Sequence, residues 1–203
     1  MSRAAVFLDK DGTLVENLPY NVDPARIRLA PDALTAVAQL HAHGYVIVVI
    51  TNQAGVARGK FEERALHGVE LRLRELLAPV QVPLAAMYWC PHQPDGVVPR
   101  YAVECDCRKP LPGLLWKAAR ALDLDLGRSW MVGDILDDIE AGRRAGCRTV
   151  LLDVGHETQW RLSSLRLPHL VATNLARAAA AIIDAGSAVP HAGEAPGVPQ
   201  PIH

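Results

Sequence analysis

The sequence predicts an α/β protein, a three-layer Rossmann-like sandwich in which helices cover both faces of a central parallel sheet. Short apolar runs alternate with amphipathic segments of helical length along most of the chain. The runs are apolar at consecutive positions, which is typical of strands that are buried on both faces. A chain in which such strands alternate with helices builds a parallel sheet. Half of the 203 residues are hydrophobic, which is enough for one core of ordinary size.

The expected elements follow from these patterns. The expected strands are residues 4–8, 45–50, 85–89, 130–132, 149–152 and 169–172. The expected helices are residues 31–44, 61–77, 113–122, 137–145 and 175–184. Gly44 and Gly146 end two of these helices, as glycine commonly does. We expect residues 1–185 to form one domain and residues 186–203, which are rich in Pro, Gly and Ala, to be a disordered tail.

Composition excludes several classes of partner. The net charge is −1 and no basic or acidic block is present, so we expect neither nucleic acid nor a membrane as partner. No apolar run approaches the ~18 residues of a transmembrane helix, and the N-terminus does not resemble a signal peptide. We therefore expect a cytoplasmic monomer. Cysteines in that compartment are reduced, which favours metal binding or a place in the core over disulfides.

Polar residues stand at the ends of the predicted strands. Asp9, Thr51, Cys90 and Asp134 each end or follow an apolar run. Ligands of parallel sheets bind beyond the carboxyl ends of the strands. The sequence therefore predicts that these side chains gather along one rim of the sheet.

The rim carries the groups of a phosphoryl-transfer site. Two carboxylates stand two residues apart in the stretch Asp9-Lys10-Asp11-Gly12-Thr13, a pattern that suits a hard cation such as Mg²⁺ but also a simple polar turn. Asp134, followed by two more acidic residues at 137–138, adds carboxylates. Thr51 supplies a hydroxyl and Lys109 a cation. Together these groups favour phosphoryl transfer over a polar turn.

The same residues carry a family resemblance. The chain resembles the haloacid dehalogenase-like phosphatases in four motifs and in their order: Asp9-x-Asp11-Gly12-Thr13, Thr51 at a strand end, Lys109, and Gly133-Asp134 with acidic residues after it. Within that superfamily it is most similar to the D-glycero-D-manno-heptose-1,7-bisphosphate phosphatases and the related histidinol phosphatases. The stretches FLDKDGTLVENLPY, ITNQAGVARG, CDCRKP and MVGD carry this likeness.

The resemblance implies a mechanism and a set of roles. Asp9 is the expected nucleophile, which forms an aspartyl-phosphate, and Asp11 the expected general acid and base. Mg²⁺ is expected on Asp9, the Asp11 main-chain carbonyl, Asp134 and one further acidic residue, for which we favour Asp138 over Asp137. Thr51, Asn52 and Lys109 are expected to hold the phosphoryl oxygens. The other expected substrate-binding residues are Asn17, Leu18, Pro19, Tyr20, Gln53 and Arg108.

The resemblance also implies a small phosphorylated sugar as substrate, most specifically the 7-phosphate of heptose 1,7-bisphosphate. One position departs from the pattern: Ile135 stands where we associate a lysine with the heptose enzymes. Histidinol phosphate and other sugar phosphates therefore remain alternatives. More distant alternatives are a polynucleotide 3′-phosphatase and a non-catalytic metal-binding protein. Only about 40 residues separate Asp9 from Thr51, so we expect no large cap domain over the site.

Four residues form a second candidate metal site. Cys90, His92, Cys105 and Cys107 come as C-x-H and C-x-C pairs separated by 12 residues. Three thiolates and an imidazole make a closed tetrahedral set for structural Zn²⁺. The family resemblance implies the same zinc loop, whereas a disulfide would leave an odd cysteine. The insert 93–104 carries few apolar residues, so we expect zinc to order it.

Two further residues receive no catalytic role. Cys147 precedes a predicted strand and is expected to be a core thiol. His156 follows the strand at 149–152 and is near enough to approach the rim, but we assign it a loop role.

Overall fold

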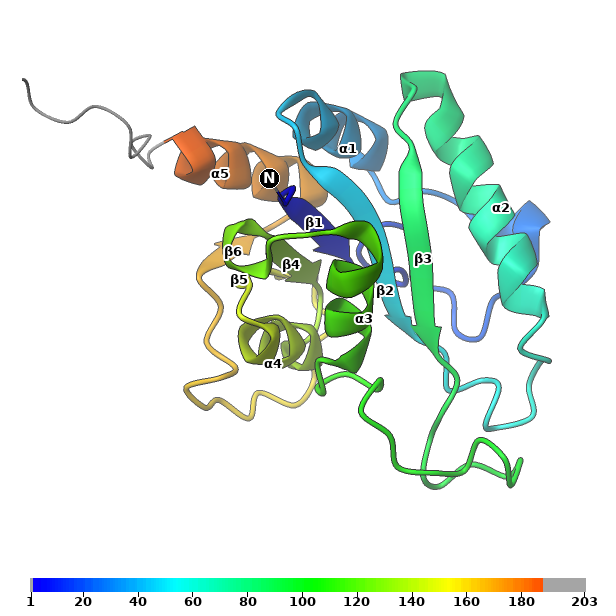
Figure 1. Ribbon diagram of the computed structural model, residues 1–203. Helices are drawn as coiled ribbons and strands as arrows, with labels where there is room; N and C mark the ends of the chain where they lie inside the picture. Colours follow the sequence, from blue (N-terminus) through cyan, green and yellow to red (C-terminus); the bar gives the residue numbers. More distant parts are fainter. Residues whose placement is uncertain (1, 188–203) are drawn as a thin grey trace, which may run out of the picture.

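A computed structural model of the chain describes residues 2–187 (Figure 1). The strands are β1 (Ala5–Leu8), β2 (Val46–Asn52), β3 (Leu84–Cys90), β4 (Trp130–Gly133), β5 (Arg148–Leu152) and β6 (Leu170–Ala172). The helices are α1 (Ala33–Ala42), α2 (Ala65–Leu77), α3 (Gly113–Leu122), α4 (Leu136–Ala145) and α5 (Leu175–Ser187). The predicted α/β class is thereby confirmed.

All six strands form one parallel sheet in the order β3-β2-β1-β4-β5-β6. Leu8 of β1 is in register with Val49 of β2 and with Val132 of β4. In this register Asp9, Thr51 and Asp134 stand within about one residue of the same level at the carboxyl edge of the three central strands. In Figure 1 the arrowheads of β2 and β3 mark this edge of the sheet, and the green segment that follows β3 lies beside it.

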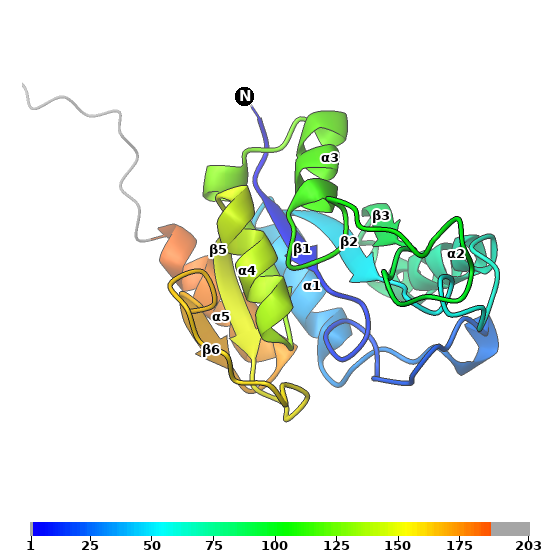
Figure 2. The same cartoon turned by 90° about the horizontal axis from the view of Figure 1, so that it is seen from below.

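Helices cover both faces of the sheet. Val6 and Leu8 of β1 pack in a core cluster with residues of α1, α2 and α5. Ala5 and Phe7 point the other way and pack in a second cluster with residues of α3 and α4. This alternation along a strand buried on both sides explains why the run is apolar at every position. Figures 1 and 2 show the resulting three layers.

The largest differences from the predicted boundaries lie in two helices. α2 begins at Ala65 and not at residue 61, because Ala65 and Leu66 donate to the carbonyls three residues earlier and the preceding residues form a turn. α5 continues to Ser187, two residues into the predicted tail. The rest of that tail, residues 188–203, lies outside the described residues.

The connections leave the carboxyl edge uncovered. Between β1 and β2 the chain forms an irregular loop and α1, and among residues 2–187 no additional domain covers this edge. The segment between β3 and α3, green in both views, contains the predicted zinc ligands. Within the same residues, no helix is both long enough and apolar enough to cross a membrane.

Candidate active site

A cavity of about 210 Å³ opens at the carboxyl ends of β1, β2 and β4. Its lining residues come from the predicted motifs and from two loops: Asp9, Asp11, Asn17, Thr51, Asn52, Lys109, Asp134, Ile135 and His156. Asp9 follows β1, Thr51 is the penultimate residue of β2, and Asp134 follows β4. The register of the strands is what brings residues so distant in sequence to one cavity.

Three carboxylates cluster at this cavity, and two of them, Asp9 and Asp134, line it. Asp9, Asp134 and Asp138 are buried, and each offers an oxygen that lies within 4.8 Å of the others. Burial, and then repulsion from Asp9, raises the pKa of Asp134 to about 6. Burial also raises the pKa of Asp138 to about 8, against the attraction of the neighbouring Lys109. Buried oxygens that repel one another in this way fit a divalent hard cation, which would compensate their charge.

The structure distinguishes Asp138 from Asp137. Asp138 is fully buried, and its Oδ2 accepts a hydrogen bond of 3.3 Å from the backbone N–H of Ile135. Its Oδ1 lies 2.5 Å from Lys109 Nζ. Asp137 points elsewhere, because its Oδ1 pairs with the Arg166 guanidinium at 2.7 Å. Of the two neighbours, only Asp138 faces the acidic cluster.

Lys109 is a buried cation that contacts the carboxylates of the site. Its Nζ lies 2.6 Å from Asp9 Oδ1 and donates to the Ile50 carbonyl at 3.1 Å. Burial opposes its charge, but the carboxylates of Asp138 and Asp9 outweigh that effect and raise the pKa of Lys109 above its usual value. The Asn52 side chain fixes the Lys109 backbone, since its Oδ1 accepts from Lys109 N and its Nδ2 donates to Lys109 O, both at 3.0 Å.

Asp11 is held by two neighbours that the motif itself does not reveal. Lys10 is almost fully buried, and its Nζ lies 2.8 Å from Asp11 Oδ1. Gln53 Nε2 donates to Asp11 Oδ2 at 3.1 Å and to Thr51 Oγ1 at 2.9 Å. Burial raises the pKa of Asp11, and Lys10 partly offsets this rise. Gln53, expected to bind substrate, contacts Asp11 and does not line the cavity.

Gly12 has to be a glycine in this arrangement. Its φ of +85° belongs to the left-handed region, and a Cβ there would lie 2.2 Å from Asp134 Oδ2 and 2.6 Å from His156 Nδ1. Any side chain would therefore push Asp134 and His156 out of place. Gly44 has nearly the same φ, +84°, but a Cβ there would meet nothing within 4 Å.

We expect Gly12→Ala to lower kcat/KM by about 100-fold, the scale of an ångström-sized displacement at a catalytic site. Gly44→Ala is the matched control, because it carries the same backbone strain without the contact. Both variants are compared by steady-state kinetics and thermal unfolding. Equal activity of the two variants would show that the close approach at Gly12 has no catalytic consequence.

Other predicted residues are placed as follows. Asn17 lines the cavity, whereas Leu18, Pro19 and Tyr20 do not. Tyr20 is exposed, and its hydroxyl accepts from the Arg58 guanidinium at 3.2 Å. The Arg108 guanidinium donates to the His92 carbonyl at 3.3 Å and does not line the cavity.

Two minor expectations had different outcomes. Cys147 is buried in the core as predicted, and burial raises its pKa to about 12. The expectation that His156 has only a loop role is wrong. Its Nδ1 lies 2.7 Å from Asp134 Oδ2, and it lines the cavity.

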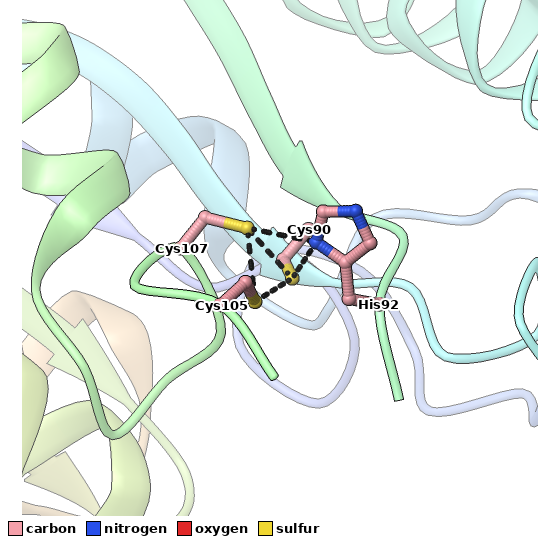
Figure 3. A group of neighbouring side chains, drawn as sticks. All are labelled: Cys90, His92, Cys105 and Cys107. Carbon is pink, nitrogen blue, oxygen red and sulfur yellow. Dashed lines mark hydrogen bonds between the residues drawn. The ribbon is translucent and has the colours of Figure 1, made fainter. Parts of the chain in front are cut away.

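The four predicted zinc ligands converge beside this site (Figure 3). Cys107 Sγ lies 3.0 Å from Cys90 Sγ, 3.3 Å from Cys105 Sγ and 3.3 Å from His92 Nδ1. Cys90 Sγ lies 3.5 Å from Cys105 Sγ and 3.8 Å from His92 Nδ1. A zinc tetrahedron with Zn–S bonds of ~2.3 Å has edges of ~3.8 Å, so the observed set is a slightly contracted tetrahedron. The donor set and its spacing fit Zn²⁺.

The thiols are not poised as free nucleophiles. Burial raises the pKa of Cys105, and the hydrogen bond with Cys90, followed by burial, raises the pKa of Cys107 far above its usual range. Without a cation these thiols stay protonated at neutral pH. Zinc binding would therefore release protons.

The insert between the ligand pairs has an anchor of its own. Tyr101 is buried, and its hydroxyl donates to Glu63 Oε2 at 2.7 Å. Trp89 Nε1 donates to the other oxygen of Glu63 at 2.9 Å. The backbone N–H groups of Val97 and Val98 donate to the Ala57 carbonyl. The expectation that zinc alone orders the insert is therefore incomplete.

Comparison with known proteins agrees with this geometry. A family described as "HAD-hyrolase-like" matches residues 106–178. D-glycero-beta-D-manno-heptose-1,7-bisphosphate 7-phosphatase of Salmonella typhi is 36% identical over 170 residues, which cover 79% of this chain and 90% of that protein. The chain belongs to the haloacid dehalogenase-like hydrolases. Like its named relatives in this family, it is a phosphatase.

Two further members of the haloacid dehalogenase-like family extend the comparison. The protein of the same name from Pasteurella multocida is 39% identical over 154 residues, covering 75% of this chain and 83% of that one. The crystal structure of D,D-heptose 1.7-bisphosphate phosphatase from B. bronchiseptica, complexed with magnesium and phosphate, matches with a TM-score of 0.73 and 31% identity. That match covers 90% of this chain and 99% of the other.

Proposed function

We propose that this phosphatase removes the 7-phosphate of D-glycero-D-manno-heptose 1,7-bisphosphate through an aspartyl-phosphate on Asp9. The observation that carries the proposal is the convergence of Asp9, Asp11, Asp134 and Lys109 on one cavity. The names of relatives that cover most of the chain support the choice of substrate. We assign the whole reaction to one domain, residues 1–185.

Asp9 is the proposed nucleophile. Its carboxylate oxygen attacks phosphorus, a P–O bond to Asp9 forms, and the bond to the sugar oxygen breaks. The contact of 2.6 Å between Lys109 Nζ and Asp9 Oδ1 fixes the carboxylate at the cavity wall. We propose that Lys109, Thr51 and Asn52 also contact the phosphoryl oxygens, which lets the lysine stabilise the charge that develops there.

Asp11 is the proposed general acid and base. It gives a proton to the leaving sugar oxygen. It then accepts a proton from the water that attacks the phosphorus of the intermediate, and the P–O bond to Asp9 breaks, which releases phosphate and restores the Asp9 carboxylate. A carboxyl has to be protonated before the first step, and the raised pKa of Asp11 supports this role. The bonds from Gln53 and Lys10 hold the Asp11 side chain in one orientation for both steps.

We propose that Asp9, Asp134, Asp138 and the Asp11 carbonyl would hold magnesium. When bound there, magnesium neutralises the repulsion between the anionic nucleophile and the phosphate. The close grouping of three buried carboxylates supports this assignment. The relative from B. bronchiseptica was crystallised with magnesium and phosphate, which adds support from within the family.

We propose that the four-residue cluster of Figure 3 binds one structural zinc. Cys90 pairs with Asn52 across the sheet, and Asn52 in turn binds the Lys109 backbone. Cys107 stands two residues before Lys109. A metal at the cluster would therefore hold Lys109 in position through Asn52 and through the chain that follows Cys107. It would take no part in the chemistry.

The substrate is expected to extend out of the cavity. We propose that Asn17 contacts the sugar, and that the segment 18–20 and Arg108 meet its distal part. Gln53 belongs to the same set through its contact with Asp11. Ile135, the one departure from the heptose-enzyme pattern, lines the cavity. Histidinol phosphate and other small sugar phosphates are the competing substrates.

A substrate panel tests this proposal. We expect kcat/KM for heptose 1,7-bisphosphate to exceed that for histidinol phosphate and for fructose bisphosphate. Discrimination of about a hundredfold is within reach of a site that binds a substrate's polar groups. If kcat/KM for histidinol phosphate were about a hundredfold higher than for heptose 1,7-bisphosphate, the heptose assignment would be wrong. The phosphatase chemistry would still hold.

We further propose a cytoplasmic monomer that acts on small molecules, with neither nucleic acid nor a membrane as partner. The net charge of −1 supports a neutral surface with no preference for polyanions. Cysteines that bind zinc also have to stay reduced, as they do in the cytoplasm.

A further inference from the structure

The segment between β5 and β6 brings a histidine to the active site from outside all four motifs. His156 lines the cavity, and its Nδ1 lies 2.7 Å from Asp134 Oδ2. It is not one of the side chains of the candidate metal cluster Asp9, Asp134 and Asp138, whose oxygens lie within 4.8 Å of one another. His156 therefore contacts one of the proposed cation ligands without completing the ligand set itself.

The segment that carries His156 is fixed to α4 by side chains. Glu157 Oε2 accepts a hydrogen bond of 2.7 Å from the backbone N–H of the first residue of α4. Near the other end of the segment, the Arg166 guanidinium donates to Asp137 Oδ1 at 2.7 Å and to Glu140 Oε2 at 2.6 Å. Most residues of the segment 153–162 are exposed, so these bonds, and not core packing, hold the histidine in place.

Asp134 needs such a partner. Its carboxylate faces the negative charge of Asp9, and its other bond, from Thr13 Oγ1 to Oδ1, is long at 3.5 Å. The absence of a side chain at Gly12 leaves room for the Asp134 and His156 side chains to meet. Partners that hold a metal-binding carboxylate orient it and tune the affinity of the site.

We propose that His156 is a positioning residue, whose Nδ1–H donates to Asp134 Oδ2 and holds that carboxylate in the orientation that binds the divalent cation. This inference rests on the proposed magnesium-dependent function. It adds a fifth element, from the β5–β6 segment, to the four motifs that build the site.

The test uses three substitutions and a control on the full chain. Mn²⁺ binding is measured directly by electron paramagnetic resonance, with Mn²⁺ standing in for Mg²⁺. Turnover of p-nitrophenyl phosphate is measured as a function of Mg²⁺. We expect His156→Ala to weaken Mn²⁺ binding by about 10–100-fold. His156→Asn places an amide N–H where Nδ1 stands and should recover most of this loss, whereas His156→Gln places it one bond further and should not.

Gln159→Ala is the matched control, because Gln159 is exposed in the same segment and does not line the cavity. The Mg²⁺ concentration for half-maximal rate should shift with His156→Ala, while KM at saturating Mg²⁺ stays unchanged. Wild-type Mn²⁺ affinity in His156→Ala would overturn the role of His156 but not the proposed function. Equal losses of Mn²⁺ affinity in the His156→Asn and His156→Ala variants would do the same. A wild-type protein that neither binds Mn²⁺ nor requires Mg²⁺ would instead overturn the proposed function.

Discussion

Asp9→Asn is expected to abolish phosphatase turnover, with a loss on the order of 10⁴–10⁶-fold in kcat, as for other enzymes that lose a covalent nucleophile. An amide is too weak a nucleophile to attack a phosphate. The fold should survive, because Lys109 keeps its contact with Asp138 and one of the three mutually repelling carboxylates is removed. The variant's unfolding temperature should therefore equal or exceed that of the wild type.

Asp184→Asn is the control for this substitution, since Asp184 is exposed on α5, far along the chain from every motif. It should keep full activity. Magnesium-dependent turnover at the wild-type rate by a folded Asp9→Asn protein would remove Asp9 from the role of nucleophile.

Cys107→Ala is expected to have the second largest effect. Structural zinc sites contribute apparent binding free energies of ~10–16 kcal/mol, so losing one of four ligands should release the metal and loosen the segment around residues 91–107. Lys109 lies two residues beyond Cys107, and its displacement should lower kcat/KM by about 100-fold. The sheet should persist, because Cys107 lies outside the strands and is only partly buried against the core.

Cys147→Ala is the matched control, because it removes a buried thiol that is not part of the cluster. Metal analysis of the purified proteins should give about one zinc per chain for the wild type and for Cys147→Ala, and none for Cys107→Ala. Limited proteolysis reports on the segment. A metal-free wild type with full activity would contradict the zinc assignment. An intact segment in Cys107→Ala would also contradict it, unless the Tyr101–Glu63 contact alone holds the segment. Adding Tyr101→Phe to the Cys107→Ala protein removes that contact and decides between the two.

Much of this architecture is predictable because it depends on local patterns. The strand β2 is a continuous apolar run that ends in the polar pair Thr51-Asn52. Its type, its burial on both faces and the place of its polar end all follow from the run itself. The same holds for Asp9 after β1 and Asp134 after β4. Parallel strands in this register leave little freedom in where such residues meet.

The remaining contacts depend on three-dimensional register, which the sequence does not display. Nothing in D-x-D marks Lys10 as a buried partner of Asp11, and the bond from Gln53 depends on how the loop after β2 turns. His156 lies in an exposed segment without periodicity, so only the fold brings it to Asp134. Tyr101 likewise reaches Glu63 across a gap of 38 residues.

The most direct test of the account is to trap the covalent intermediate in the Asp11→Asn protein. With p-nitrophenyl phosphate the leaving group departs without a proton, so the first step proceeds while hydrolysis of the intermediate lacks its base. Acid quenching followed by borohydride reduction converts an aspartyl-phosphate to homoserine, which peptide mass spectrometry locates. We predict homoserine at position 9, formed together with a burst of p-nitrophenol. Release of p-nitrophenol with no modified residue at position 9 would contradict the account.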